Sequence, residues 1–538
     1  MFELNFLFYL SPIICTISFA RPVRAEKAGH TSAMMRFIRG KRREARGWHP
    51  PVKPQYPGVP EPGALRSLFR DCGDFRALDL RLGGAEGRLT GTLCYLDGLV
   101  NGDAVGEAVI RPLTEEERFG AAAEPEKAAA LAREALAWFY SFRIRRSLEE
   151  TAEDLVEGCC ALVFSGLALT FETKASLGRG VEQPETEKTV KGAKEAFTEI
   201  YRQNTALLRR RLRCPELKLR ELTVGRRSRT RVGILYIESL TDPLLGEEIQ
   251  SRLERLDLDG LMNSGDLEEY LLEKSSPFPQ MLATERPDRF AMELLQGRAG
   301  LLVDGLPLGF LFPATLAETL RVPEDTAAHF AVASVLTLLR YLALFLSVLL
   351  PALYVAVTMY HQEMVPTRLL LSIIQSKQDV PFSTAGETLG MLVAFELLQE
   401  AGLRLPATIG QSVSIIGALI VGQSAVEAKV ISPVVVIVVA IAGITGYTMP
   451  NQDMAAALRL CRFAMVILSV GLGLFGMVTG VLLLLYYLCT LEPFGTAYLS
   501  PFCDGSFREV LGVVLRQPLP RIKYRLPWLK PADKRRQK

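Results

Sequence analysis

The sequence Ser-Ser-Pro-Phe-Pro-Gln-Met-Leu-Ala-Thr-Glu-Arg-Pro-Asp occupies residues 275–288 and separates two chemically different parts of the chain. Its three prolines fix the backbone φ angle and remove amide donors, which predicts a rigid, shaped connector. The residues before it are charged and mixed in pattern, whereas residues 330–490 contain long apolar runs that suit a bilayer. The chain is therefore predicted to have a soluble α/β N-terminal region followed by an all-α transmembrane helical domain.

Composition sets limits on the partners and compartment. Of the 538 residues 49% are apolar, which exceeds the usual soluble chain and leaves room for two or three domains. The 62 basic and 59 acidic residues nearly balance, but ten lysines and arginines, against two acids, lie between residues 508 and 538. By the positive-inside rule this tail, residues 491–538, is expected in the cytoplasm. The nine cysteines and four histidines show no disulfide or zinc spacing, so no metal or cofactor is predicted.

Residues 1–63 are predicted to be disordered or to include a start codon that is assigned too early. Residues 2–20 resemble the apolar core of a signal peptide, but Glu3 stands where such peptides carry positive charge. Met34 or Met35, followed by a basic run, would be a better beginning. The remainder of the segment is basic and then proline-rich, which is typical of disorder.

An internal repeat predicts two tandem, related α/β subdomains, at 64–150 and at 151–329 with the proline-rich connector. The matching residues, at a constant offset of 141, are Leu93, Tyr95, Leu96, Asp97, Leu99 and Asn101 with Ile234, Tyr236, Ile237, Glu238, Leu240 and Asp242. In each copy a Gly-Glu pair opens the helix that follows. Coincidence between two ordinary strand-turn-helix units is the alternative explanation.

Local patterns within these subdomains predict further elements. Hairpins with Ser-Gly and Asp-Gly turns are expected at 160–170 and 301–312. An amphipathic helix is expected over 126–147. Four arginines at 209–213 end another helix, and they either face solvent or contact an acidic partner surface or anionic lipid.

Four to five helices are predicted in the membrane domain. Its apolar segments lie at about 331–359, 388–403, 407–427, 430–449 and 463–488. Glu396, Glu400 and Arg404 recur every fourth residue in the second segment and form a stripe that lipid would not tolerate. That helix either lies in the interface or buries its stripe inside the assembly. Four full spans then keep both ends cytoplasmic but place Arg459 and Arg462 on the outer side, against the positive-inside rule.

The third apolar segment is the candidate for lining a pore. It is rich in small residues, and Gln423, Val426 and Glu427 lie at its end. A ring of Glu427 side chains from several subunits would attract cations, and the stripe residues of the second segment are further gating candidates. The alternative is a packed helix in which Glu427 pairs with Lys429 or with an arginine of a neighbouring subunit.

Motifs over about residues 65–501 resemble the GerA-type spore germination proteins, specifically the A subunit of the nutrient germinant receptor. Besides the proline-rich stretch, they include Phe-Glu-Leu-Leu-Gln-Glu-Ala-Gly-Leu-Arg-Leu-Pro at 395–406, Gly-Gln-Ser-Ala-Val-Glu-Ala at 422–428 and Phe-Gly-Thr-Ala-Tyr-Leu-Ser-Pro at 494–501. A further family pattern is met by Arg179, Pro184, Glu187, Gly192, Phe197, Glu199 and Asn204. This chain departs from that pattern at Gln183, Lys191 and Ala193.

The resemblance implies an integral protein of the spore inner membrane that acts with a transporter-like B subunit and a lipoprotein C subunit. It implies a homo-oligomer that forms a gated cation channel, with the germinant bound chiefly by the B subunit. Glu285, Arg286 and Asp288 are then candidates for contacts between subunits, and Asp288 is also placed to cap the following helix. A SpoVA-associated homologue that amplifies germination, or a non-conducting membrane scaffold, are the alternatives.

Neither an enzyme nor a nucleic-acid partner is predicted. The sequence offers no nucleophile and base pair, metal cluster or phosphate loop. Residues 471–476, Gly-Leu-Gly-Leu-Phe-Gly, match the dinucleotide fingerprint by letter but lie within an apolar segment with no preceding soluble strand. Gly476 to Gly480 is instead interpreted as a helix-packing face.

Overall fold

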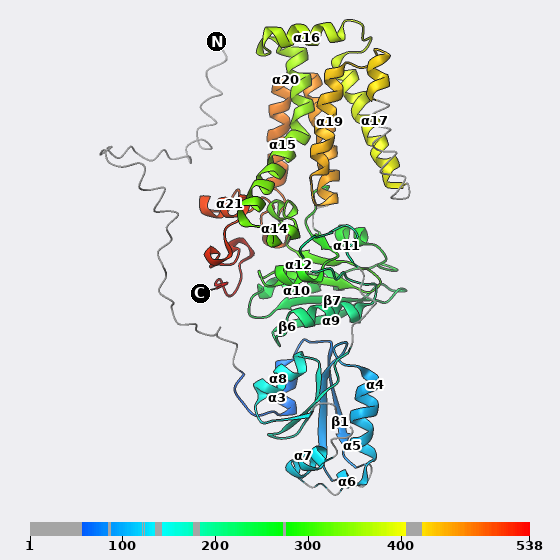
Figure 1. Cartoon of the computed structure of the whole chain (residues 1–538), viewed down its shortest axis with the longest axis vertical. Coiled ribbons are helices and arrows are strands. Elements are labelled where there is room, and N and C mark those ends of the chain that lie inside the picture. Colours follow the sequence, from blue (N-terminus) through cyan, green and yellow to red (C-terminus); the bar gives the residue numbers. More distant parts are fainter. Residues whose placement is uncertain are drawn as a thin grey trace, which may run out of the picture. The chain divides into compact units, whose positions relative to one another are not determined.

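The computed structural model describes residues 56–83, 88–120, 122, 124–134, 142–175, 183–272, 276–404 and 422–537. The predictions on the first 55 residues therefore lie outside the described residues. The described chain folds into two α/β units, each built on a five-stranded antiparallel sheet, followed by a helical region (Figure 1). The predicted fold class is confirmed.

The first sheet has the strand order β1-β2-β4-β5-β3. Its strands are β1 (Phe75–Arg81), β2 (Thr90–Leu96), β3 (Phe142–Arg145), β4 (Cys159–Val163) and β5 (Ala168–Glu172). Its helices are α3 (Pro62–Leu68), α4 (Gly102–Ala104), the π-helix Val105–Ile110, α5 (Arg111–Glu115), α6 (Glu117–Gly120), α7 (Pro125–Glu134) and α8 (Leu148–Val156). Helices α3 and α8 cover one face and the helical segment from α4 to α7 covers the other, so both faces of β2 are buried (Figure 1).

Two predictions about this unit are wrong. The boundary at residue 150 falls inside the sheet, because β4 and β5 come after it and pair with β2 and β3. The helix expected over 126–147 does not continue to its end, because residues 142–145 form the edge strand β3 and pair with β5. The hairpin expected at 160–170 is confirmed as β4 and β5.

The second sheet repeats the same order, β6-β7-β9-β10-β8. Its strands are β6 (Leu217–Val224), β7 (Thr230–Ile237), β8 (Leu282–Thr284), β9 (Ala299–Val303) and β10 (Gly309–Phe312). Its helices are α9 (Tyr201–Arg211), α10 (Pro243–Glu254), α11 (Ser264–Leu271) and α12 (Pro287–Leu294). Helices α10 and α11 pack on one face, while α9 and α12 pack on the other. The hairpin predicted at 301–312 is confirmed as β9 and β10.

The repeat extends to matched residues within the two units. Leu93 on β2 pairs with Leu162 on β4, and Ile234, 141 residues later, pairs with Leu301 on β9. The aligned Asn101 and Asp242 both accept backbone amide hydrogen bonds at the start of the following helix. Side-chain oxygens at that position satisfy amides that the helix itself leaves unpaired. The two copies thus share topology, register and helix capping.

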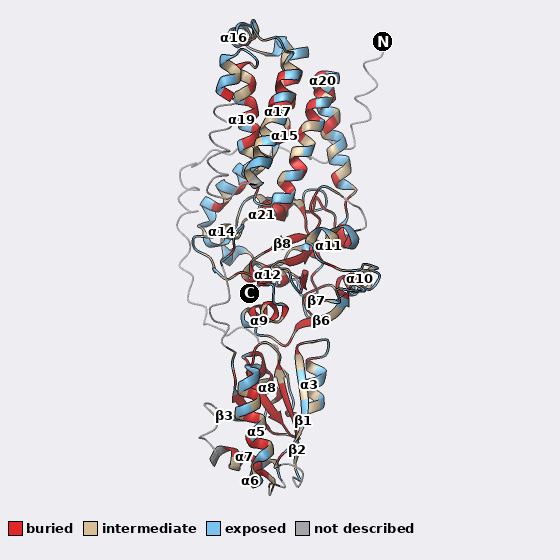
Figure 2. Cartoon of the chain, turned by 90° about the vertical axis from the view of Figure 1, so that its right-hand side faces the viewer, coloured by how far each residue is buried: buried red, intermediate tan, exposed pale blue. Residues whose placement is uncertain are grey.

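The helical region follows the second sheet. Its helices are α13 (Leu316–Thr319), α14 (Pro323–Ala327), α15 (Phe330–Tyr360), α16 (Thr367–Lys377), α17 (Thr384–Arg404), α19 (Pro433–Tyr447), α20 (Gln452–Cys489) and α21 (Phe507–Val514). Among the described residues, α15 and α20 are long and apolar enough to cross a membrane. Exposed residues recur along both helices in Figure 2, and they include large apolar ones such as Val335 and Phe475. Helix α16 was not predicted, and most of the third predicted segment lies outside the described residues.

Helix α20 is two helices joined at a sharp bend. Gly473 has φ 61° and ψ −140°, which an L side chain does not adopt readily. A Cβ atom on Gly480 would lie 2.6 Å from Sδ of Met465, fifteen residues earlier, whereas that separation spans about 22 Å in a straight helix. The two arms therefore fold back against each other. Close packing along the glycines that follow the bend agrees with the packing face predicted at Gly476 to Gly480.

The bend lies at the end of the helical region that is remote from the second sheet. Tyr360, the last residue of α15, donates a hydrogen bond of 2.5 Å to the carbonyl of Val470 beside the bend. The other ends of both arms return to the second sheet unit. There, the charge of Asp453 acts on Glu268 of α11, and the ring of Tyr487 lies 6.2 Å from that of Phe278.

Candidate functional site

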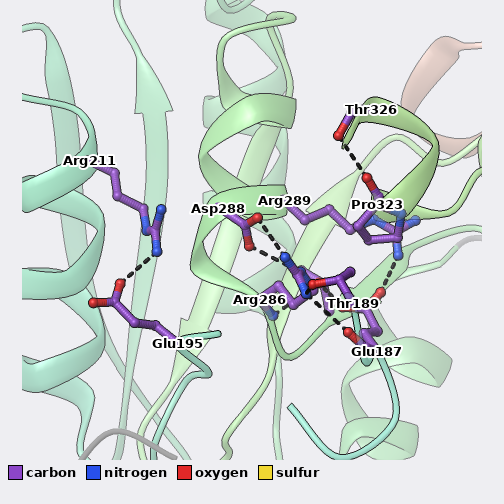
Figure 3. A network of polar contacts seen from close by, with 10 residues as sticks. Glu187, Thr189, Glu195, Arg211, Arg286, Asp288, Arg289, Pro323 and Thr326 are labelled. Atoms are coloured by element: carbon purple, nitrogen blue, oxygen red, sulfur yellow. Dashed lines mark hydrogen bonds and ion pairs between the residues drawn. The ribbon is translucent and has the colours of Figure 1, made fainter. Parts of the chain in front are cut away.

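The proline-rich stretch ends in a buried arginine (Figure 3). Arg286 immediately precedes α12, and its side chain is 1% exposed. Its guanidinium donates to both carboxylate oxygens of Asp288, at 3.1 and 2.8 Å. It also donates to the carbonyl of Glu187 at 3.1 Å and to Oγ1 of Thr189 at 2.8 Å. Two of these four charge-assisted hydrogen bonds thus join the arginine to a loop almost one hundred residues earlier, and the other two bind its neighbour Asp288.

The residues around Arg286 make the same connection. The carboxylate of Glu285 accepts hydrogen bonds from the amides of Glu185 and Thr186, at 2.8 and 3.2 Å. Its carbonyl accepts the amide of Phe197 at 2.7 Å. The carboxylate of Glu187 in turn accepts from Thr284 and Arg289 (Figure 3). We call the docked segment, residues 183–199, the motif loop.

Gly192 shows why the motif loop requires a glycine. A Cβ atom at this position would lie 2.8 Å from Nη2 of Arg286 and 2.6 Å from Oγ1 of Thr189. Backbone and guanidinium can approach this closely only without a side chain. The glycine and the arginine, which belong to different sequence motifs, are therefore parts of one contact.

The structure places the predicted subunit-contact residues in this intramolecular network. Arg286 is buried within the chain, so its side chain has an internal role. Asp288 does not cap α12, because Pro287 is the first residue of the helix and Asp288 follows it, where its carboxylate binds Arg286. The predicted capping is therefore wrong. A contact of Glu285 or Asp288 with another subunit stays a prediction.

The other end of the proline-rich stretch contacts the helical region. Phe278 is buried, and its ring lies 6.2 Å from Tyr487 at the end of α20 and 6.4 Å from Tyr498. The amide of Leu316, which follows the second sheet, donates to the carbonyl of Tyr498 at 2.9 Å. The stretch therefore touches the motif loop at one end and the last apolar helix at the other, and we call it the brace.

The segment after α20 inserts an aromatic ring into the second sheet unit. Phe494 packs edge-on against Phe312, with ring centroids 5.0 Å apart, and the guanidinium of Arg252 lies 4.5 Å from its centroid. Its φ of 49° is a strained value for a residue with a side chain. A cavity of about 330 Å³ adjoins it, lined in part by Gln280 and Glu492. Nearby on α11, burial and the charge of Asp453 raise the pKa of Glu268 to about 7.

The arginine cluster divides into two kinds of contact. Arg209 and Asp74 are both buried, and the guanidinium donates to the two carboxylate oxygens at 2.8 and 2.9 Å. This pair joins the second unit to the first. Arg210 and Arg211 contact Glu195 of the motif loop. Arg209 therefore has a structural role that neither predicted alternative included.

Charged groups of the helical region pair across helices. Glu396 of the predicted stripe accepts from Arg459 of α20 at 2.7 Å, and Gln399 accepts from the same guanidinium at 3.3 Å. Arg462 is buried and donates to the carbonyl and hydroxyl of Ser347 on α15, at 2.7 and 2.6 Å, and to the carbonyl of Ala442 at 3.0 Å. Glu396 thus contacts another helix, whereas Glu400, one turn on, is exposed, so burial of the whole stripe inside an assembly stays a prediction.

The remaining pore candidates lie in two places, at residues 422–427 and in the last two turns of α17. Residues 422–427 are helical, and the exposed carboxylate of Glu427 accepts a hydrogen bond of 2.9 Å from Gln423, one turn earlier. Val426, directly before Glu427, is half-buried. Among the described residues, the ion pair of Lys429 is with Asp379 rather than with Glu427. Glu400 lies one turn beyond Glu396 on α17. Arg404 ends that helix, and its side chain lies outside the described residues.

A buried acid escaped the sequence analysis. Glu387 on α17 is 2% exposed, accepts the amide of Ser432 at 2.7 Å and pairs with Lys377 of α16 at 3.3 Å. Glu387 stands in the first turn of α17, a largely apolar helix. A carboxylate in such a helix, close in sequence to Lys377, was the signal that could have indicated this pair. Among the described residues, no group of three or more His, Cys, Asp or Glu side chains could hold a metal ion.

Two α/β units of one topology, braced to helices whose apolar faces are exposed, define a class of protein compatible with a membrane. The family model described as Bacillus/Clostridium GerA spore germination protein matches residues 63–527, and the chain belongs to this family. The chain is 35% identical to the uncharacterized membrane protein YfkQ of Bacillus subtilis (strain 168), with 84% of this chain and 88% of that protein covered.

Other relatives carry germination names. Spore germination protein KA of Bacillus subtilis (strain 168) is 34% identical, over 79% of this chain and 78% of that protein. Spore germination protein B1 of the same strain is 34% identical, over 84% and 93%. The crystal structure of the N-terminal domain of the A subunit of the Bacillus megaterium spore germinant receptor GerK3 aligns with a TM-score of 0.38 and 24% identity, covering 48% of this chain and 97% of that chain.

Proposed function

We propose that this chain is the A subunit of a nutrient germinant receptor in the spore inner membrane, and that its oligomer conducts cations when the receptor is triggered. Membership of the GerA family and the named germination relatives support the receptor role. The observation that carries the proposal further is the brace, which contacts the motif loop through Arg286 and the last apolar helix through Phe278. A transporter-like B subunit and a lipoprotein C subunit are the proposed partners.

The brace offers a route by which a signal could reach the helices. A ligand or partner shifts a conformational equilibrium only by binding one state more tightly than the other. The motif loop and the end of α20 are both fixed to one rigid, proline-containing segment, so a movement of either changes the contacts of the other. Germinant binding to the B subunit would favour the arrangement in which the helices open.

The helical region supplies polar groups suited to a cation path. Glu427 is exposed at a helix end and carries only an amide hydrogen bond from Gln423 among the contacts described above. Several subunits would place such carboxylates in a ring, which concentrates cations. The paired Glu396 and Arg459 are suited to stabilising the closed bundle, because separating a partly buried pair is costly.

The connections to the second sheet support a cytoplasmic location of both large ends. Helix α15 begins just after α14, and Arg340 of α15 pairs with Asp325 of α14. The second arm of α20 ends beside Phe278. The first and last apolar helices therefore start and finish at the same sheet unit, so an even number of crossings is expected. The positive charge of the tail supports the proposal that this side faces the cytoplasm.

Ion flux in liposomes tests the proposal. The full chain, with its B and C partners, is compared with Glu427→Gln and with the control Glu363→Gln, which changes another exposed acid of the helical region. We expect cation flux on addition of germinant, several-fold lower flux for Glu427→Gln and unchanged flux for the control. A folded oligomer that passes no ions in any form would refute conduction and leave the scaffold alternative.

A further inference from the structure

Helix α21, in the basic tail, carries an unpartnered apolar stripe. Its start is fixed by a capping box of Ser506 and Glu509. Phe507 and Leu511, one turn apart in the helix, and Leu515, which follows its last residue, are 79%, 43% and 37% exposed. Val513, on a different side of the helix, is buried. One side of α21 thus packs on the protein while an apolar side faces outward.

Arg516, two residues after the end of this helix, fixes its position beside the start of α15. The guanidinium of Arg516 donates to the carbonyls of Asp325, Thr326 and Ala328, which form the end of α14. The carbonyl of Arg516 accepts from the hydroxyl of Ser334 at 3.3 Å. Ser334 lies in the second turn of α15. Both cartoon views place α21 at this end of α15 (Figures 1 and 2).

Exposed apolar side chains also lie in the first turns of α15, beside which α21 is held. Val332, Val335 and Leu336 of the first turns of α15 are 54%, 59% and 43% exposed. The tail supplies exposed cations at Arg508 within α21 and at Arg521 and Lys523 shortly after it. An apolar face with cations near it is the pattern of a helix that lies in the headgroup region of a bilayer, since the side chains enter the acyl boundary while the cations meet anionic headgroups.

We propose that α21 is an interfacial helix that inserts Phe507, Leu511 and Leu515 into the membrane surface around the first turns of α15. The proposal rests on the proposed membrane location of α15. Because Arg516 ties α21 to α14, the helix would hold the end of the second sheet unit at a fixed depth relative to the lipid. The occupant is the lipid surface, because the stripe lies beside the start of an apolar helix that requires lipid around it.

Site-specific photocrosslinking tests the proposal on the full chain in vesicles of phosphatidylcholine and phosphatidylglycerol. Benzoylphenylalanine replaces Phe507 in one variant and Leu511 in a second. If one variant fails to fold, the other still tests the proposal. The same probe at Val335 reports whether α15 itself meets lipid. A probe at Val190, which is 80% exposed on the motif loop, is the matched apolar control.

We expect lipid adducts at 507 and 511 in at least about tenfold excess over residue 190, because burial of such a side chain favours the apolar phase by about 1.5 kcal/mol or more. Adducts at 335 without adducts at 507 and 511 would overturn the interfacial helix while leaving the membrane location of α15 intact. Crosslinks from 507 to a second copy of the chain would assign the stripe to an interface between subunits and would also overturn the proposal. Failure at 335 as well would reject the membrane location.

Discussion

Replacing Arg286 by alanine should release the motif loop from the brace. The side chain is buried and donates four hydrogen bonds, two of them to the loop at Glu187 and Thr189. Removing one partner of a buried ion pair costs about 3–5 kcal/mol, and the lower value applies here because Asp288 keeps some contact with water. If that loss falls on docking of the loop, its undocked population rises about a hundredfold.

The rate of cleavage by the lysine-specific protease Lys-C measures the population of the undocked motif loop. The motif loop contains Lys188, Lys191 and Lys194, all exposed, and cleavage of a transiently opened segment follows its open population. We expect cleavage near these residues to accelerate about a hundredfold in Arg286→Ala. Arg286→Lys should fall between this variant and the unchanged chain, because an ammonium group cannot reproduce the planar fork of hydrogen bonds.

The control for this experiment is Arg227→Ala. Arg227 is 86% exposed and lies 3.9 Å from Asp259, a surface pair that contributes at most about 1 kcal/mol. Its cleavage pattern should not change. If Arg286→Ala is cut within about threefold of the unchanged chain, Arg286 does not hold the motif loop, and the route proposed from loop to helices loses its first contact.

Two further predictions concern the sheet units. Arg209→Leu should destabilise the chain by about 3–5 kcal/mol, because Asp74 then stays buried without its partner. Adding Asp74→Ala should restore part of this stability, since the unpaired charge is removed. Equal thermal midpoints for the single and double variants would contradict this prediction. The pKa of Glu268 is higher in the folded than in the unfolded chain, so its contribution to stability is complete below the unfolded pKa and is lost as the pH rises through the folded pKa. The thermal midpoint should therefore decrease as the pH is raised from about 4.5 to 7. Glu268→Gln should flatten this dependence, worth roughly 1–2 kcal/mol after screening; an unchanged profile would contradict it.

The repeat could be predicted from sequence because both copies preserve the same buried strand and helix start. The offset of 141 residues aligns Leu93 with Ile234, and both side chains are fully buried at equivalent positions of β2 and β7. The edge strand β3 could not be predicted. It is four residues long, it includes two arginines, and its pairing partner β5 lies more than twenty residues later. Nothing local distinguishes such a strand from the last turn of an amphipathic helix.

The two halves of the candidate site were recognisable separately, but not their contact. Gly192 belongs to one motif and Arg286 to another, and each motif could be named from the resemblance. Their approach depends on β8 lying at the edge of the second sheet, which is a property of the whole topology. The same limit applied to Asp288, whose position in α12 suggested a cap until the pairing with Arg286 was known.

If α15 and α20 cross the membrane as proposed, the bend in α20 removes the conflict of Arg459 and Arg462 with the positive-inside rule. The last apolar segment was counted as one crossing, which placed Arg459 on the outer side. Because the chain reverses at Gly473, the first arm must begin on the side where the second arm ends, and the contacts of Asp453 and Tyr487 put both at the second sheet unit. Arg459 lies two turns from that end and Arg462 three, so both belong to the half of the bundle nearest the basic tail. The conformation of this single glycine thus divides the last apolar segment into two arms, and the side to which Arg459 and Arg462 are assigned changes with it.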